Sequence, residues 1–223
     1  MIVDIAGGAV IGCDDLGNPA HPAVILSGGL ATQRTVWPDL LCTALVDAGY
    51  RVIRFDNRDI GLSTWLDDLG VPDIPGLMAA AASGKSGEVP YTLDDMADDA
   101  VAVLDSLGID AAHICGASMG GMICSGIARD REAVHYLSGM AVIGGPPDAG
   151  FLTTPAAKRR MPIYLSQGSA DSVYPVEGQA AVYRKLRAAG YPVRLTVFNT
   201  GGHGTPIRMT DWRKLLNFLL TAD

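Results

Sequence analysis

Residues 113–122 read HICGASMGGM, and this stretch decides the fold. It starts as an apolar strand, turns sharply at Ser118 and continues as the beginning of a helix. Gly-x-Ser-x-Gly is the pattern of a serine that projects from a strained turn at the end of a strand. Gly116 and Gly120 leave room for the chain to pack closely on both sides of that turn. The sequence therefore predicts a strand, a tight turn and a helix, with Ser118 as a nucleophile.

The helix after the turn adds a second feature. Its first N–H groups point out of its N-terminus, where the backbone dipole gives a partial positive charge. The N–H of Met119 is therefore expected to bind the oxyanion that forms when a serine attacks a carbonyl carbon. The same pentapeptide also occurs by chance in glycine-rich turns, so the prediction depends on a base and an acid elsewhere in the chain.

Composition limits the number of domains and the classes of partner that this chain can have. The chain has 223 residues, of which 48% are hydrophobic and 18% charged, which suits one domain over residues 1–223. A formal net charge of −7 argues against nucleic acid as a partner. The sequence has no apolar run long enough to span a membrane, and its start has no basic segment typical of a signal peptide. We therefore expect a cytoplasmic protein with no membrane partner.

The cysteines and glycine-rich segments give no sign of a metal or a cofactor. None of Cys13, Cys42, Cys115 and Cys124 forms a Cys-x-x-Cys pair, so free thiols are expected. Gly84-Lys85-Ser86 resembles the end of a phosphate-binding loop, but Ala79 stands where that loop needs a glycine. We expect neither a metal nor a cofactor.

Strands and helices alternate along the chain. Apolar runs predict a small hairpin within 1–13, a strand that His113 opens before the turn at Ser118, and further strands at 23–26, 51–55, 137–144, 162–165 and 193–198. Helical periodicity and capping residues predict helices at 38–48, 93–107, 119–130, 176–189 and 210–220. This alternation predicts an α/β fold with a mostly parallel sheet and helices on both faces. Ligands in such sheets bind at the carboxyl ends of the strands.

A serine nucleophile needs a base, and His203 is the candidate. It lies in a glycine-rich loop after the last predicted strand, at the carboxyl edge that also carries Ser118. His113 and His135 lie near the amino ends of their strands, and His21 lies in an early loop. The alternative for His203 is an ordinary solvated loop histidine.

The acid that orients the base is expected to be Asp171, which follows the strand at 162–165. Asp148 is the rival, because it follows the preceding strand at the same edge. The alternative for Asp171 is a structural turn aspartate before a helix. The order serine, aspartate, histidine matches one of the known orders of a catalytic triad.

At these residues the chain resembles the α/β-hydrolase superfamily. Residues 51–64 and 91–96 are similar to the esterase group that includes aclacinomycin methylesterase. The resemblance implies a serine esterase without a cofactor, in which the residue after Gly29 gives an oxyanion N–H; that residue is Leu30. The family often has His-Gly or Met-Gly at this turn, whereas this chain has Gly28-Gly29.

The resemblance also shows a deficit. Family members commonly carry a large helical cap where this chain has only residues 145–161. We therefore expect a minimal cap or none, an open cleft, and residues 65–90 as a segment that could act as a flap. The expected partner is a small-molecule carboxylic ester. The sequence does not decide whether the chain forms a homo-oligomer. Perhydrolase, haloperoxidase-like or lactonase activity on the same triad is the alternative, and a non-catalytic binding protein is the alternative of another class.

Overall fold

A single sheet forms the centre of the protein, and its strand order places the site. The computed structural model describes residues 1–5, 8–85, 87, 89–129, 137–145 and 160–221. In these ranges eight strands run in the order β1-β2-β4-β3-β5-β6-β7-β8. They are β1 (Ile2–Asp4), β2 (Val10–Leu16), β3 (Ala23–Ser27), β4 (Arg51–Phe55), β5 (Ala112–Ala117), β6 (Leu137–Ile143), β7 (Ile163–Gly168) and β8 (Val193–Phe198). β1 and β2 pair antiparallel to their neighbours, and all other pairs are parallel.

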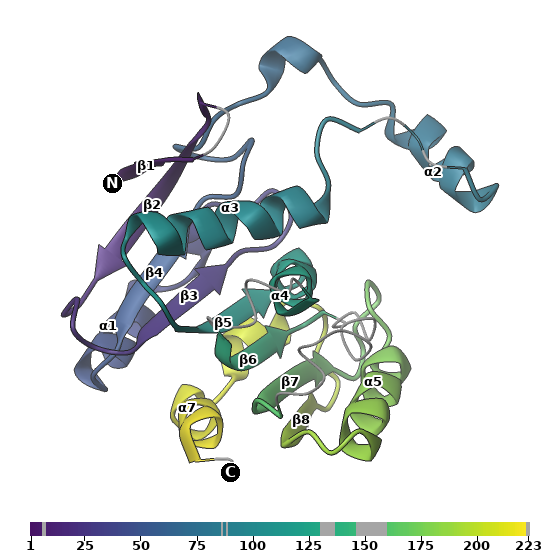
Figure 1. The fold of residues 1–223 in the computed structure, drawn as a ribbon. Helices are drawn as coiled ribbons and strands as arrows, with labels where there is room; N and C mark the ends of the chain where they lie inside the picture. The colour runs from purple at the N-terminus through teal and green to yellow at the C-terminus, as the bar shows by residue number, and fades with distance from the viewer. Residues whose placement is uncertain (6–7, 86, 88, 130–136, 146–159, 222–223) are drawn as a thin grey trace.

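Helices connect the parallel strands, as the alternation predicts (Figure 1). They are α1 (Asp39–Asp47), α2 (Ile74–Ala82), α3 (Leu93–Ser106), α4 (Met119–Arg129), α5 (Val176–Ala188), α6 (Thr205–Met209) and α7 (Trp212–Thr221), with short 3-10 turns η2 (Arg34–Val36) and η3 (Asp67–Leu69). Thr92 caps α3: Thr92 Oγ1 accepts a bond from the N–H of Asp95, and the Asp95 carboxylate accepts one from the N–H of Thr92.

Two apolar cores cover the two faces of the sheet. Alternate residues of each strand point to opposite faces, so Ile114 joins the core under α3, α4 and α5, while Cys115 joins the core under α1 and α7. Burying one such aliphatic side chain stabilises the fold by about 1.5–3 kcal/mol. The continuous burial of β3, β4, β5 and β7 explains why these strands lack the alternation of apolar and polar residues that is typical of a half-exposed strand.

The register of the sheet aligns the carboxyl ends of its parallel strands. Ser27 of β3 pairs with Gly116 of β5, and Ala117 pairs with Ile143 of β6. At the other side, Gly168 of β7 pairs with Phe198 of β8. The loops after β3, β5, β7 and β8 therefore start at one edge, which is where Leu30, Ser118, Asp171 and His203 lie.

Three local features differ from the sequence-based predictions. The hairpin forms, but β2 continues to Leu16 and pairs with β4. The last helix begins at Trp212 rather than near 210, and a short helix, α6, precedes it with Pro206 in its first turn.

Within the ranges given above, no helix is long and apolar enough to cross a bilayer.

The thiols and the segment after β4 complete the description. All four cysteines are free and buried, and burial raises the pKa of Cys115 to about 12. Residues 65–85 leave the body of the protein, and Figure 1 shows α2 at the far end of this excursion, away from the sheet.

Candidate active site

Ser118 lies at the junction of β5 and α4 with φ of +53°, a conformation that L-residues rarely adopt. This left-handed region costs a non-glycine residue roughly 1–2 kcal/mol. Two backbone hydrogen bonds hold the turn: the Ser118 N–H donates to the Ile143 carbonyl at 2.9 Å, and the Ser118 carbonyl accepts from the Gly121 N–H at 2.9 Å. The serine is therefore held in a strained turn at a strand end, as its pattern predicts.

The glycines around Ser118 are required by close backbone contacts. A Cβ atom on Gly116 would overlap the backbone of Gly120, and a Cβ atom on Gly120 would overlap the carbonyl of Ser27. A Cβ atom on Gly145 would lie 2.6 Å from the Ser118 carbonyl oxygen. β3, the turn and the start of α4 therefore pack backbone against backbone.

His203 connects Ser118 to Asp171. Its Nε2 lies 2.9 Å from Ser118 Oγ, and its Nδ1 lies 2.8 Å from Asp171 Oδ2. The loops that carry the base and the acid are joined by hydrogen bonds from Ala170 N–H to the Gly201 carbonyl and from Thr200 N–H to Ser169 Oγ. Three side chains from three loops thus form one continuous hydrogen-bonded chain. A neutral imidazole in this position can accept the serine proton.

Asp171 is held as a carboxylate. Its side chain is fully buried, and burial favours its neutral form. The N–H groups of Tyr174 and Val173, together with the His203 ring, outweigh that effect and lower the pKa of Asp171. Gln167 Nε2 donates a further bond of 2.7 Å to Asp171 Oδ2 and another to the Tyr174 carbonyl. An ionised Asp171 can orient His203 and stabilise its protonated form.

Gln167 and Tyr174 were not identified from the sequence. Gln167 interrupts the apolar run of β7, and a polar residue in a buried strand signals that a partner must exist. The Tyr174 ring lies 5.6 Å from the His203 ring between centroids. The residue is close to the site only because Asp171 begins the turn before α5.

The remaining candidate residues do not join this cluster. His113 is buried beside Tyr50, and burial lowers the pKa of its imidazole. His21 is exposed in the loop before β3. His135 and Asp148 lie outside the residues that the structure describes. Asp171 contacts His203, and the choice of Asp171 over Asp148 as the acid stays a prediction.

Two backbone N–H groups border Ser118. Met119 is the first residue of α4, so its N–H has no acceptor within the helix. Leu30 follows Gly29, where an added Cβ atom would lie 3.2 Å from the Ser118 Cβ atom. Both residues line the same cleft as Ser118 and His203. Donors so placed can stabilise an oxyanion on a carbonyl bound to Ser118 Oγ.

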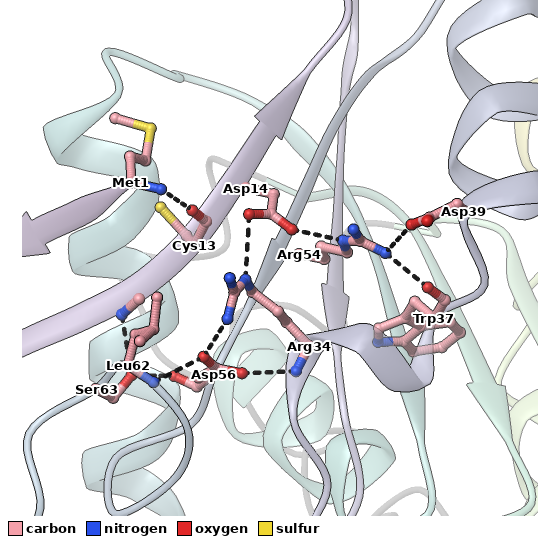
Figure 2. Close-up of polar contacts among 11 residues, drawn as sticks. Met1, Cys13, Asp14, Arg34, Trp37, Asp39, Arg54, Asp56, Leu62 and Ser63 are labelled. Carbon is pink, nitrogen blue, oxygen red and sulfur yellow. Dashed lines mark hydrogen bonds and ion pairs between the residues drawn. The ribbon is translucent and has the colours of Figure 1, made fainter.

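A buried ion-pair network anchors the segment that follows Leu30 (Figure 2). The fully buried Asp56 carboxylate accepts bonds of 2.6 Å from both the backbone N–H and Nη1 of Arg34. Asp14 bridges Arg34 and Arg54, whose Nη1 donates to the Trp37 carbonyl. Burial opposes ionisation of Asp14, but the two guanidinium groups lower its pKa overall. The network ties the chain after β3 to β2 and β4.

The cleft around Ser118 has a volume of about 630 Å³ and is mainly apolar in its lining. Val36, Ile143, Val173 and Ile207 contribute to its walls. Among the described residues of 65–90, none lines this cleft, so the flap remains a prediction. Most of 145–161 lies outside the described residues. Among the described residues, no group of three or more His, Cys, Asp or Glu side chains could hold a metal ion.

Comparison with known proteins agrees with the fold. Residues 22–161 match the family model described as alpha/beta hydrolase fold. Rhodomycin D methylesterase DnrP of Streptomyces peucetius is 34% identical over 139 residues, which cover 62% of this chain and 40% of that protein. 3-Oxoadipate enol-lactonase 1 of Acinetobacter baylyi is 29% identical over 115 residues, covering 52% and 34% respectively. The chain thus spans about two fifths or less of the length of these relatives.

Solved structures extend the similarity of the fold to nearly the whole chain. A hydrolase from Pseudomonas aeruginosa PA01 superposes with a TM-score of 0.72 at 16% identity, covering 99% of this chain and 98% of that one. A thermophilic esterase from Thermogutta terrifontis gives a TM-score of 0.69 at 18% identity, covering 99% of both chains. At such identities the likeness concerns the fold.

Proposed function

The chain belongs to the alpha/beta hydrolase fold family, and on that premise we propose that it is a serine hydrolase that cleaves a carboxylic ester. The observation that carries the proposal is the continuous chain of hydrogen bonds from Ser118 through His203 to Asp171. The names of the relatives, a methylesterase and an enol-lactonase, support an ester as the substrate.

The proposed reaction has two halves. Ser118 Oγ attacks the ester carbonyl while His203 Nε2 takes the hydroxyl proton, and the oxyanion is held by the N–H groups of Leu30 and Met119. The intermediate expels the alcohol, which receives the proton from His203, and leaves an acyl group on Ser118. Water then attacks the acyl-enzyme with His203 as the base, which releases the acid and restores the serine. Asp171 keeps its charge throughout and stabilises the imidazolium.

A lactone is the second candidate substrate. It is a cyclic ester, so the same residues would open it, with the alcohol and the acid remaining in one product. The enol-lactonase relative favours this candidate. Methyl esters and lactones of matched size, compared in one assay, would separate the two.

The decisive test is the Ser118→Ala variant with p-nitrophenyl acetate as substrate. Removing the nucleophile is expected to lower kcat by a factor on the order of 10⁴–10⁶. Ser106→Ala, an exposed serine at the end of α3, is the matched control and should keep full activity. A fluorophosphonate should add covalently to Ser118 in the unmodified protein. Normal turnover by Ser118→Ala would refute the proposed mechanism.

A further inference from the structure

A second cleft adjoins the one around Ser118. Its volume is about 380 Å³, and it lies between the loop after β4 and the start of α3. Leu30, Leu93 and Met119 line both clefts, so the second cleft begins where the two proposed oxyanion donors stand. Its other lining residues are Ala31, Asn57, Arg58, Asp59, Ile60, Tyr91, Thr92 and Met96.

The position of His203 separates the two halves of an ester. His203 must protonate the leaving alcohol, so the alcohol has to lie within reach of its Nε2. His203 lines the first cleft and not the second. With the carbonyl oxygen between the N–H groups of Leu30 and Met119, the group on the other side of the carbonyl carbon continues toward the second cleft.

We propose that the second cleft is the acyl subsite, and that Arg58 there recognises a neutral hydrogen-bond acceptor on the acyl group, such as a keto oxygen. This inference rests on the proposed esterase function and deepens it.

Arg58 is fixed so that one of its nitrogen atoms remains available. Nε and Nη2 each donate a bond of 2.7 Å to the carboxylate of Asp99, and Nη2 also donates to the Asp95 carbonyl. The guanidinium lies over the ring of Tyr91, 5.5 Å from its centroid. In the described part of the chain Nη1 has no partner, and the Arg58 side chain is 25% exposed. A rigid donor at the cleft wall thus has hydrogen-bonding capacity to spare.

The surrounding charge decides between a neutral acceptor and a carboxylate. The Asp99 side chain is only 4% exposed, so its negative charge is directed at Arg58 and balances the guanidinium charge. Asp59 also lines the cleft, and Asp95 lies in the first turn of α3. A second carboxylate would meet a net negative environment, whereas a keto oxygen would accept the Nη1 proton without that repulsion. Ile60, Met96 and Met119 give the cleft an apolar lining, which suits the carbon chain that joins the ester carbonyl to the keto group.

Two bulky substitutions test the assignment of the clefts. Ile60→Trp partly fills the second cleft, and Val173→Trp partly fills the first. Each variant is assayed with one series of esters in which only the acyl group lengthens and one in which only the alcohol lengthens. Ile60→Trp should lower kcat/KM at least tenfold more for esters with a long acyl group than for esters with a long alcohol group. Val173→Trp should lower kcat/KM more for the esters with a long alcohol group. Equal losses in both series for Ile60→Trp would overturn the assignment.

Three further esters test the recognition by Arg58: the ethyl esters of pentanoate and 4-oxopentanoate, and monoethyl succinate. The unmodified protein should prefer the keto ester to the plain ester by about tenfold in kcat/KM, and should hydrolyse the succinate ester most slowly. In Arg58→Lys, which keeps the charge opposite Asp99 but loses the planar fork, the keto preference should fall toward one. An unchanged preference, or a preference for succinate, would overturn the recognition.

Labelling by a small fluorophosphonate distinguishes the two levels of failure. If the protein is not labelled at Ser118 and hydrolyses no ester, the proposed esterase function is refuted together with the acyl subsite. If it is labelled and active but does not discriminate between acyl groups, only the proposal of the acyl subsite is refuted.

Discussion

Gln167 shows how much a single buried side chain contributes to the candidate site. Its amide donates to Asp171 Oδ2, the same oxygen that faces His203 Nδ1. The amide therefore favours the ionised carboxylate and fixes its direction. Gln167 touches neither Ser118 nor the cleft, so its role is to position Asp171.

We expect Gln167→Leu to lower kcat about tenfold while KM changes little, because a charge-assisted hydrogen bond to Asp171 is lost and substrate contacts are kept. Gln179→Leu, which replaces another fully buried glutamine on α5, should leave kcat unchanged. Steady-state kinetics on one ester measure both effects. Equal kcat values for the two variants would show that the Gln167 amide does not matter.

The identity of the acid can be tested at the same scale. Asp171→Asn should reduce kcat by about 10³–10⁴, because an amide cannot stabilise the imidazolium and favours the wrong tautomer of His203. Asp148→Asn should leave kcat within a factor of about two. Ester hydrolysis by the two purified variants decides the matter, and the reverse pattern would transfer the role to Asp148.

Among the elements, β3 and α4 depend on the absence of a side chain at Gly120. A methyl group there would overlap the Ser27 carbonyl. Gly120→Ala should therefore destabilise the protein by about 1–3 kcal/mol or more, seen as a lower midpoint of urea unfolding. Gly178→Ala in α5 is the matched control, because nothing lies within 4 Å of the added atom. It should raise the midpoint slightly, since alanine favours a helix more than glycine does. A lower midpoint for both variants would contradict the steric explanation.

Some elements could be predicted from the sequence and others could not, for physical reasons. β5 and β7 were predicted because they are buried on both faces, so apolar residues follow one another in them, as Ile114-Cys115 does in β5 and Ile163-Tyr164-Leu165 does in β7. The end of β2 was not, because the predicted hairpin ends at residue 13 and the polar Asp14 and Asp15 follow it. In the sheet Asp14 lies opposite Arg54 on β4, and the two form an ion pair. A partner 40 positions away in the sequence cannot be recognised from local pattern.

At the scale of the whole molecule, the lowered pKa values predict how stability depends on pH. Asp14 and Asp171 each have a pKa below the ordinary value in the folded state. A depressed pKa contributes stability above the unfolded-state value and loses it as the pH falls through the folded-state value. The buried His113 also has a lowered pKa, so it binds a proton more readily when the chain is unfolded. The free energy of unfolding should therefore begin to decline below about pH 6.5, through His113, and decline further below about pH 4, through Asp14 and Asp171.

Asp14→Asn isolates one part of this effect. The variant should be less stable than the unmodified protein at pH 7 and should lose less stability on acidification. Urea unfolding at several pH values measures both slopes. Parallel slopes for the two proteins would show that Asp14 does not contribute to acid sensitivity.

The edge of the sheet that carries the candidate site could be predicted from topology, because parallel strands align their carboxyl ends. That reasoning was enough to bring Ser118, Asp171 and His203 to one place. It could not find Gln167, Arg34 or Asp56, whose roles depend on side-chain directions and on partners from other strands. The topology of the sheet predicts the edge at which the candidate site lies, whereas side-chain packing determines which further residues hold the site residues in place.

The burial of all four thiols has a practical consequence for spectroscopy. Toward maleimide reagents the folded protein should behave as if it contained no cysteine, because Cys115 and its three counterparts are inaccessible and a raised pKa disfavours the reactive thiolate. One cysteine introduced at the exposed Ala79 of α2 would then carry a fluorophore without background labelling. Energy transfer from that fluorophore to an acceptor on a fluorophosphonate bound at Ser118 would report how far the excursion lies from the cleft, and whether ester analogues draw it closer.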